Sequence, residues 1–186
     1  ESPLHPKAFE VLHAAFDNGW ADPAKLSESS AKARALRNNA LETIATALNV
    51  RVESLVPVSP ISLGYFLGIQ GLTLSSKTLI HGATDRKDVF AVAAQNRHQV
   101  MQSALDGKLI PTPTDSKNSI LALQIANAET GVVQECDAII AATNPEHIFL
   151  DATTSGVRVA LGNQFTTALF DSKSWYGPSA VSYTHL

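Results

Sequence analysis

The 186-residue chain has the composition of one globular domain, or of one large domain cut short, and its charge excludes some partners. Hydrophobic residues make up 45% of the chain and charged residues 17%, which suffices for a buried core and argues against wholesale disorder. The formal net charge is -3, and no cluster of Lys and Arg exceeds two neighbours. The chain therefore lacks the basic footprint of a nucleic-acid-binding protein.

Cysteine and histidine usage excludes further classes of site. The single cysteine, Cys136, rules out an internal disulfide and a cysteine-based zinc site, and it fits a reducing, cytoplasmic compartment. The six histidines lack the spacing of metal ligands, so no metal site is predicted. The longest apolar run, residues 61–74, is too short and too interrupted to span a bilayer.

Apolar periodicity and turn residues predict alternating helices and strands. The helix of residues 29–49 has the clearest apolar stripe, Ser29 or Ser30 can cap it, and Asn49 is a plausible left-handed terminator. Ser59 followed by Pro60 indicates a helix start. In chain order, we expect a helix over 6–18 that ends at Gly19, a helix over 29–49, a strand over 53–58, a helix over 60–74, a strand over 77–81, a helix over 85–105 closed by Gly107, a strand over 120–125, a helix over 135–143, and strands over 147–151 and 165–170.

This alternation, with nearly continuous apolar strands, predicts an α/β fold of three layers, in which helices flank a mostly parallel sheet. Ligands of such folds lie beyond the carboxyl ends of the strands. The segments that follow the predicted strands are therefore the candidate site, namely residues 59–62, 82–86, 126–131, 151–155 and 171–174.

Four segments resemble the cysteine desulfurase branch of the class V aminotransferases, which are pyridoxal phosphate (PLP) enzymes. Lys77–Phe90 resembles the family's segment with Glu-His, Ala126–Gln134 its Asn-Asn-Glu-x-Gly-x-x-Gln loop, Phe149–Ser155 its Val-Asp-Ala-x-Gln-Ser segment, and Ser174–Pro178 its Lys-x-Tyr/Gly-Gly-Pro segment. The resemblance covers residues 2–180. It implies the large PLP-binding domain of such a protein, incomplete at both ends, and a homodimer.

The resemblance implies roles for three residues around the cofactor ring. Asp151 matches the aspartate that pairs with the pyridine nitrogen and keeps the ring an electron sink; alternatively it caps a turn at the strand end. Asn127 matches the asparagine that hydrogen-bonds the ring oxygen. Thr154 stands where the family has a glutamine, and its alternative role is packing in a β-turn.

Other positions depart from the family pattern. Arg86 stands where a histidine stacks on the ring; a guanidinium can stack but cannot replace imidazole as an acid or base, and a solvated helix start is the alternative. Ser59-Pro60-Ile61-Ser62 stands where the family has its glycine-containing phosphate cradle. Pro60 has no N–H and Ile61 is bulky, so the phosphate grip should be weaker, and a plain helix cap explains Ser59 and Ser62 better.

Ser174 is the decisive position, because it stands where the family has the Schiff-base lysine, and a hydroxyl cannot form an imine. Lys173 is adjacent and could serve instead if a local bulge turned it inward; otherwise it contacts phosphate or lies at the surface. Three hypotheses follow. The chain is a degenerate, non-catalytic homologue; or it is an active PLP enzyme that uses Lys173 on cysteine or another amino acid; or it binds another anion at the helix start near Ser59.

We expect residues 1–180 to be a fragment of the PLP-binding domain and residues 181–186 to be a non-native tail. The chain begins without methionine, and Val181–Leu186 back-translates to a sequence that resembles the end of a transposon adapter used in DNA library preparation. An ordinary C-terminal strand is the alternative for these residues.

Overall fold

The computed structural model describes residues 3–17, 21–74, 77–113, 117–159, 162, 164–178 and 181–185; the predicted helix end at Gly19 lies outside them. The helices are α1 (Pro6–Asp17), α2 (Glu28–Leu48), α3 (Ile61–Thr73), α4 (Lys87–Ala93) and α5 (Cys136–Thr143). The strands are β1 (Leu55–Val58), β2 (Thr78–Gly82), β3 (His98–Met101), β4 (Ser119–Gln124), β5 (His147–Asp151), β6 (Thr167–Asp171) and β7 (Val181–His185). Short 3₁₀ turns are η1 (Val52–Ser54), η2 (Gly156–Arg158) and η3 (Ser172–Trp175).

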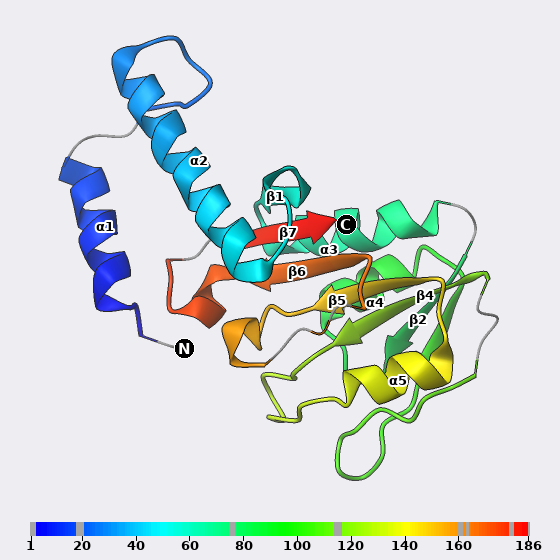
Figure 1. Cartoon of the computed structure of the whole chain (residues 1–186). Helices are drawn as coiled ribbons and strands as arrows, with labels where there is room; N and C mark the ends of the chain where they lie inside the picture. The colour runs from blue at the N-terminus through cyan, green and yellow to red at the C-terminus, as the bar shows by residue number, and fades with distance from the viewer. Residues whose placement is uncertain are drawn as a thin grey trace.

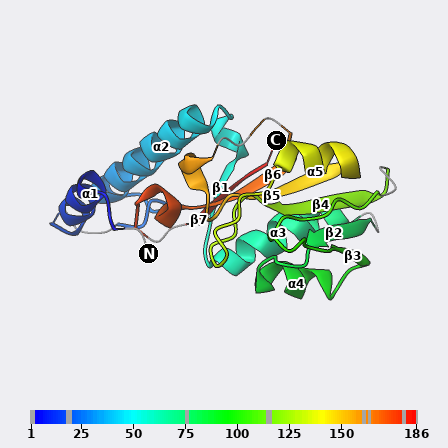
Figure 2. The same ribbon diagram turned by 90° about the horizontal axis from the view of Figure 1, so that it is seen from below.

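The described strands form one sheet in the order β1-β7-β6-β5-β4-β2-β3 (Figure 1). Strands β3, β2, β4, β5 and β6 pair in parallel, whereas β7 is antiparallel to both of its neighbours. Helices α3 and α4 cover one face of the sheet and α5 covers the other, as Figure 2 shows edge-on. The predicted three-layer α/β fold with a mostly parallel sheet is therefore confirmed.

The middle strand β4 explains why the apolar runs in the sequence are nearly continuous. Every residue of β4 is buried, and its side chains alternate between the two faces of the sheet. Leu121 and Leu123 pack in the cluster that includes α5, while Ile120 and Ala122 pack in the cluster that includes α3 and α4. A strand covered on both faces leaves no position for a polar residue that faces solvent.

Helix α3 contacts the sheet closely at two residues that have no side chain. A Cβ atom on Gly64 would lie 2.5 Å from Leu169 Cδ1, and one on Gly68 would lie 2.5 Å from Phe149 Cε2. These glycines follow each other at one helical turn and therefore share the face that contacts β5 and β6. The close contact brings the neighbouring Tyr65 to the end of β5.

The helix predicted over residues 85–105 is wrong beyond Ala93. Helix α4 ends there, a turn follows, and residues 98–101 form β3, which pairs in parallel with β2. The Asn96 side chain donates to the Val92 carbonyl at 2.8 Å and to Gln70 on α3 at 3.0 Å. A side chain that competes for backbone groups favours a helix end, and the pairing of β3 with β2 then outweighs the local helical pattern.

Two predicted helix starts are shifted. The N-cap of α2 is Ser27, whose hydroxyl accepts from the backbone N–H of Ser30 at 3.1 Å, rather than Ser29 or Ser30. Pro60 is the N-cap of α3 rather than its first helical residue. The left-handed terminator Asn49 is confirmed, with a φ of 54°.

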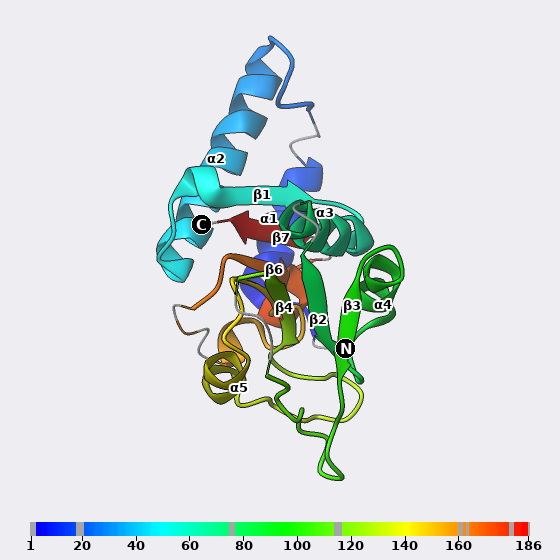
Figure 3. The same ribbon diagram turned by 90° about the vertical axis from the view of Figure 1, so that its right-hand side faces the viewer.

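Helices α1 and α2 form an arm that extends away from the sheet (Figures 1 and 3). No residue of α1 is buried, and α2 buries Ser30 and Ala45. The base of the arm contacts the rest of the chain, since Leu48 packs on the α5 side of the sheet and His5 donates a backbone hydrogen bond to the Tyr176 carbonyl at 2.8 Å. Across the described residues, no helix combines the length and apolarity that crossing a membrane requires.

The backbone of residues 181–185 lies between β1 and β6 as strand β7. Its register pairs Leu55 with Thr184 on one side and Thr167 with His185 on the other. The strand conformation does not distinguish a native from a non-native segment, so both alternatives stay predictions. Leu186 lies outside the described residues.

Candidate functional site

A group of polar side chains lies at the carboxyl ends of β2 and β5, beside the first turns of α3. We call it the strand-end cluster; its members are Tyr65, Asp85, Arg86, Asp151 and Thr153. Its position is the one where parallel α/β sheets bind ligands.

Asp151 is the centre of the cluster, and both of its carboxylate oxygens have partners. The Tyr65 hydroxyl donates to Oδ2 at 2.6 Å. The backbone N–H and the hydroxyl of Thr153 donate to Oδ1 at 2.9 and 2.6 Å. Burial raises the pKa of Asp151 above that of a free aspartate, and these hydrogen bonds and the Arg86 charge act against the increase.

Tyr65 is completely buried; its hydroxyl contacts Asp151, and its ring lies near Arg86. Its ring packs against Phe149, with a centroid separation of 5.9 Å, and the Arg86 Cζ atom lies 5.9 Å from the ring centroid. Burial raises the pKa of the Tyr65 hydroxyl, so it stays a hydrogen-bond donor. Tyr65 is not among the site residues predicted from the sequence. The available signal is the single tyrosine in the apolar residues 61–74, since a buried tyrosine needs a polar partner.

Asp85 is the less satisfied carboxylate of the cluster. Its Oδ2 accepts from the backbone N–H of Gly82 at 2.8 Å, whereas its buried Oδ1 has no hydrogen-bond partner among the described residues. Burial is the main cause that raises the pKa of Asp85 to about 7, and the nearby charge of Asp151 adds to it. Asp85 lies within the candidate segment 82–86, but the charged run that follows it is equally typical of a solvated helix start, so the sequence does not predict that Asp85 is buried.

Asn127 uses all of its side-chain hydrogen bonds within the protein. Its Nδ2 donates to the Thr84 carbonyl at 2.9 Å and to Gln124 Oε1 at 3.1 Å. Its Oδ1 accepts from the backbone N–H groups of Glu129 and Thr130 at 2.9 and 3.0 Å. An amide has two donor hydrogens and two acceptor lone pairs, so none remains for a ligand while this loop keeps its shape.

The remaining predicted ring and phosphate contacts lie around the cluster. Thr154 is partly exposed in the turn after β5, and its neighbour Thr153 makes the hydrogen bonds to Asp151. Ser59, just before α3, and Ser62, in its first turn, are both exposed; Ser62 lies about one turn before Tyr65. The Pro60 carbonyl accepts from the N–H of Leu63 at 3.0 Å. The structure thus gathers Asp151 and Arg86 around Tyr65 and leaves both serines at the surface.

Ser174 and Lys173 lie in η3, directly after β6. Ser174 is buried, with 5% of the residue exposed, and its hydroxyl donates to the Asp171 carbonyl at 2.6 Å. Gly156, whose φ is +48°, approaches so closely that a Cβ there would lie 2.3 Å from Ser174 Oγ. Lys173 is exposed, and its backbone N–H donates to Asp171 Oδ1 at 3.0 Å.

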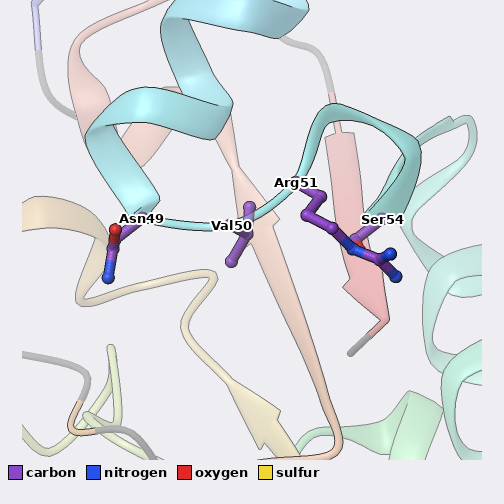
Figure 4. A pocket seen from close by; sticks show the side chains of 4 residues that line it. All are labelled: Asn49, Val50, Arg51 and Ser54. Atoms are coloured by element: carbon purple, nitrogen blue, oxygen red, sulfur yellow. The ribbon is translucent and has the colours of Figure 1, made fainter.

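Two other features, a cavity and a cysteine, lie outside the strand-end cluster. A cavity of about 380 Å³ lies between the end of α2 and η1, lined by Asn49, Val50, Arg51 and Ser54 (Figure 4). Its one charged side chain, Arg51, is exposed and lies outside the strand-end cluster. Burial raises the pKa of the Cys136 thiol to about 11, so it is not a thiolate nucleophile at neutral pH. Within the described ranges, no three His, Cys, Asp or Glu side chains are grouped as a metal site needs.

The chain has the fold of the PLP-dependent transferases. Within that fold it is similar to a NifS-like protein, with a TM-score of 0.83 and 14% identity over 100% of this chain and 56% of that chain. It is also similar to a C-DES variant with glycine covalently linked to its PLP cofactor, with a TM-score of 0.78 and 15% identity over 98% of this chain and 54% of that one. A cysteine desulfurase from Thermococcus onnurineus gives a TM-score of 0.72 and 13% identity over 95% and 50% of the two chains.

The chain spans about half the length of these proteins. No family model matches the sequence, and no curated protein matches it. The similarity therefore concerns the fold, and the predicted class V aminotransferase-like architecture is confirmed at that level.

Proposed function

We propose that this chain is a non-catalytic relative of the PLP-dependent cysteine desulfurases, with their scaffold but without their chemistry. One observation carries the proposal. Ser174, which the resemblance aligns with the Schiff-base lysine, is a buried hydroxyl that donates to the Asp171 carbonyl. A hydroxyl cannot condense with an aldehyde to form an imine, so covalent attachment of PLP at this position is excluded by the chemistry of the residue.

The surrounding residues do not fit PLP either. The hydrogen bonds of Asn127 all stay within the protein, and both oxygens of Asp151 already accept hydrogen bonds. Pro60 provides no N–H at the start of α3, where the family has its phosphate cradle. We therefore derive no catalytic step through the cofactor for this chain.

The alternative is an active PLP enzyme that uses Lys173. The exposure of Lys173 favours a surface lysine instead, because its side chain lies on the solvent side of η3 and not in the strand-end cluster. An imine-forming lysine would have to turn inward past the buried Ser174.

Reductive trapping tests the proposal. The protein is incubated with PLP, reduced with borohydride and digested, and phosphopyridoxyl groups are located by mass spectrometry. We expect no more label on Lys173 than on the exposed Lys32, which serves as the internal control for non-specific reaction. A stoichiometric adduct on Lys173 that disappears in Lys173→Arg contradicts the proposal and makes a cysteine desulfurase assay the next measurement.

We also propose that the chain forms a homodimer, as the resemblance implies. Leu63, Phe66 and Leu67 on α3 support this, since they are 39%, 42% and 40% exposed and share one outer face of the helix. A patch of large apolar side chains on a soluble surface indicates an interface. Light scattering should give twice the 19.8 kDa mass of one chain, and Phe66→Glu should give the mass of one.

A further inference from the structure

We propose that the side chain of Tyr65 takes the place of the cofactor ring in the strand-end cluster, so that the chain fills its own PLP site. This inference rests on the proposed function and extends it. Absence of the lysine excludes an imine, whereas Tyr65 excludes reversible binding of the cofactor as well.

The two groups that the resemblance assigns to the cofactor ring, Asp151 and Arg86, both contact Tyr65. The resemblance assigns Asp151 to the ring nitrogen and the residue at Arg86 to the ring face. In the structure, Asp151 Oδ2 accepts from the Tyr65 hydroxyl at 2.6 Å, and the Arg86 Cζ lies 5.9 Å from the Tyr65 ring centroid. A phenol offers a flat six-membered ring with a hydrogen-bond donor at one end, as a protonated pyridine does.

The space around Tyr65 and Asp151 is filled by protein atoms. Tyr65 is 0% exposed and Asp151 is 3% exposed, so there is no solvent-filled space between them for a second ring. The other oxygen of Asp151 accepts two hydrogen bonds from Thr153. A ligand that approached Asp151 would have to displace Tyr65 and leave its hydroxyl without a partner, which is costly in a buried site.

The packing of α3 against the sheet restricts displacement of the Tyr65 side chain. It lies on α3 next to Gly64, and Gly68 follows one turn later; both glycines hold the helix against β5 and β6 at distances that admit no extra atom. Displacing Tyr65 therefore needs either a new side-chain conformation in a filled core or a shift of the helix. The competing interpretation is that Tyr65 only positions Asp151 while PLP binds above it.

Reversible binding distinguishes the two interpretations. Equilibrium dialysis of the wild-type chain against PLP, without borohydride, should give no saturable binding up to millimolar concentration. Saturable binding that Asp151→Asn weakens at least tenfold overturns the inference. If that protein also yields no reduced lysine adduct, the proposed non-catalytic function stands while the inference fails, so the two failures can be told apart.

A cavity experiment tests the ring position directly. Tyr65→Ala should leave a ring-shaped cavity that ends at Asp151, and such cavities bind small aromatic molecules. We expect 4-methylphenol, which copies the tyrosine side chain, to raise the unfolding temperature of Tyr65→Ala, to leave the wild type unchanged, and to bind at least tenfold more tightly than toluene. Equal binding of the two compounds overturns the inference, because Asp151 would then not face the vacated ring site.

Two further variants complete the test. Ile69→Ala opens a cavity on the same buried face of α3, one turn beyond Tyr65, and should show no preference for 4-methylphenol over toluene. Tyr65→Phe keeps the ring and guards against failure of Tyr65→Ala to fold. Tyr65→Phe should still exclude PLP, because the ring fills the site; saturable PLP binding by Tyr65→Phe overturns the inference.

Discussion

The strand-end cluster and the arm formed by α1 and α2 are opposite cases of how this chain uses its side chains. In the cluster, Tyr65 and Asp151 are buried and are joined by a hydrogen bond between distant parts of the chain. In the arm, Phe9 and Val11 are 55% and 69% exposed, and α1 buries nothing. The difference teaches that the cluster has its partner inside the molecule, whereas the arm has apolar surface that only another molecule, or another part of a longer chain, could cover.

The largest effect is expected at Tyr65. Truncation in Tyr65→Ala removes a completely buried ring and the donor to Asp151, so the free energy of unfolding should fall by about 3–5 kcal/mol. Urea unfolding at neutral pH measures the change. A loss below about 1 kcal/mol would mean that the cluster is as loosely packed as the arm.

The next effect concerns pH and the second carboxylate of the cluster. The folded-state pKa of Asp85, about 7, is above the ordinary aspartate value of 3.8, so between these pH values the folded state holds a proton that the unfolded state has lost. Its contribution to stability is complete below about pH 4 and is lost as the pH rises through about 7. Between about pH 5 and pH 8 the wild type should lose about 2–3 kcal/mol through this group.

Asp85→Asn removes that loss, because an amide does not titrate in this range. Urea unfolding of both proteins at the two pH values gives the difference between their slopes. The buried His81, whose pKa is lowered by burial, acts in the opposite direction, and Asp151 acts in the same direction as Asp85. Both remain in the variant, so the difference reports the titration of Asp85 together with its coupling to Asp151. Equal slopes would contradict the buried, protonated state of Asp85.

A smaller effect is expected where α3 meets the sheet. In Gly68→Ala the new methyl group would lie 2.5 and 2.9 Å from two atoms of the Phe149 ring, and the repacking should cost about 1–3 kcal/mol. Gly71→Ala is the matched control on the same helix, because nothing lies within 4 Å of the added atom. There alanine should stabilise the helix by about 0.5–1 kcal/mol. Thermal unfolding that ranks the two variants in the reverse order would refute the close helix–sheet contact.

The smallest effect is expected in the arm. Val11→Ser changes a side chain that is 69% exposed, on a helix without buried residues, so the unfolding free energy should stay within about 0.5 kcal/mol of the wild type. The same denaturation measurement checks it. A loss comparable to that of Tyr65→Ala would show that the arm is packed in solution, and would remove the contrast between the two regions.

The two regions also differ in how well the sequence predicts them. Both helices of the arm are predicted to within about two residues, because the apolar stripe of 29–49 and the terminator Asn49 are local signals. Strands β2, β4 and β5 are predicted equally well from their continuous apolar runs. Strand β3 is missed, because its identity depends on pairing with β2 rather than on residues 98–101 themselves.

The candidate site is predicted in part. The position of Asp151 and Arg86 at strand ends follows from the order of elements, and the structure brings the two together. The sequence predicts an external ring between them and does not mark Tyr65, because Tyr65 lies in an apolar helix whose orientation depends on Gly64 and Gly68. Whether two glycines mark a loose helix or a tight contact is decided by what faces them, and that information is not local.

Strand β7 has a consequence for the order in which the molecule assembles. Among the described strands, β1 pairs with β7 alone, and β7 lies between β1 and β6. During synthesis β1 and α3 leave the ribosome long before β7. Strand β1 therefore has no backbone pairing with the rest of the sheet until β7 is synthesised. Contacts between segments distant in the sequence form slowly, since the intervening loop must close first. The pairing of β1 with the rest of the described sheet therefore depends on insertion of β7, and until then the facing edges of β1 and β6 have unpaired backbone groups.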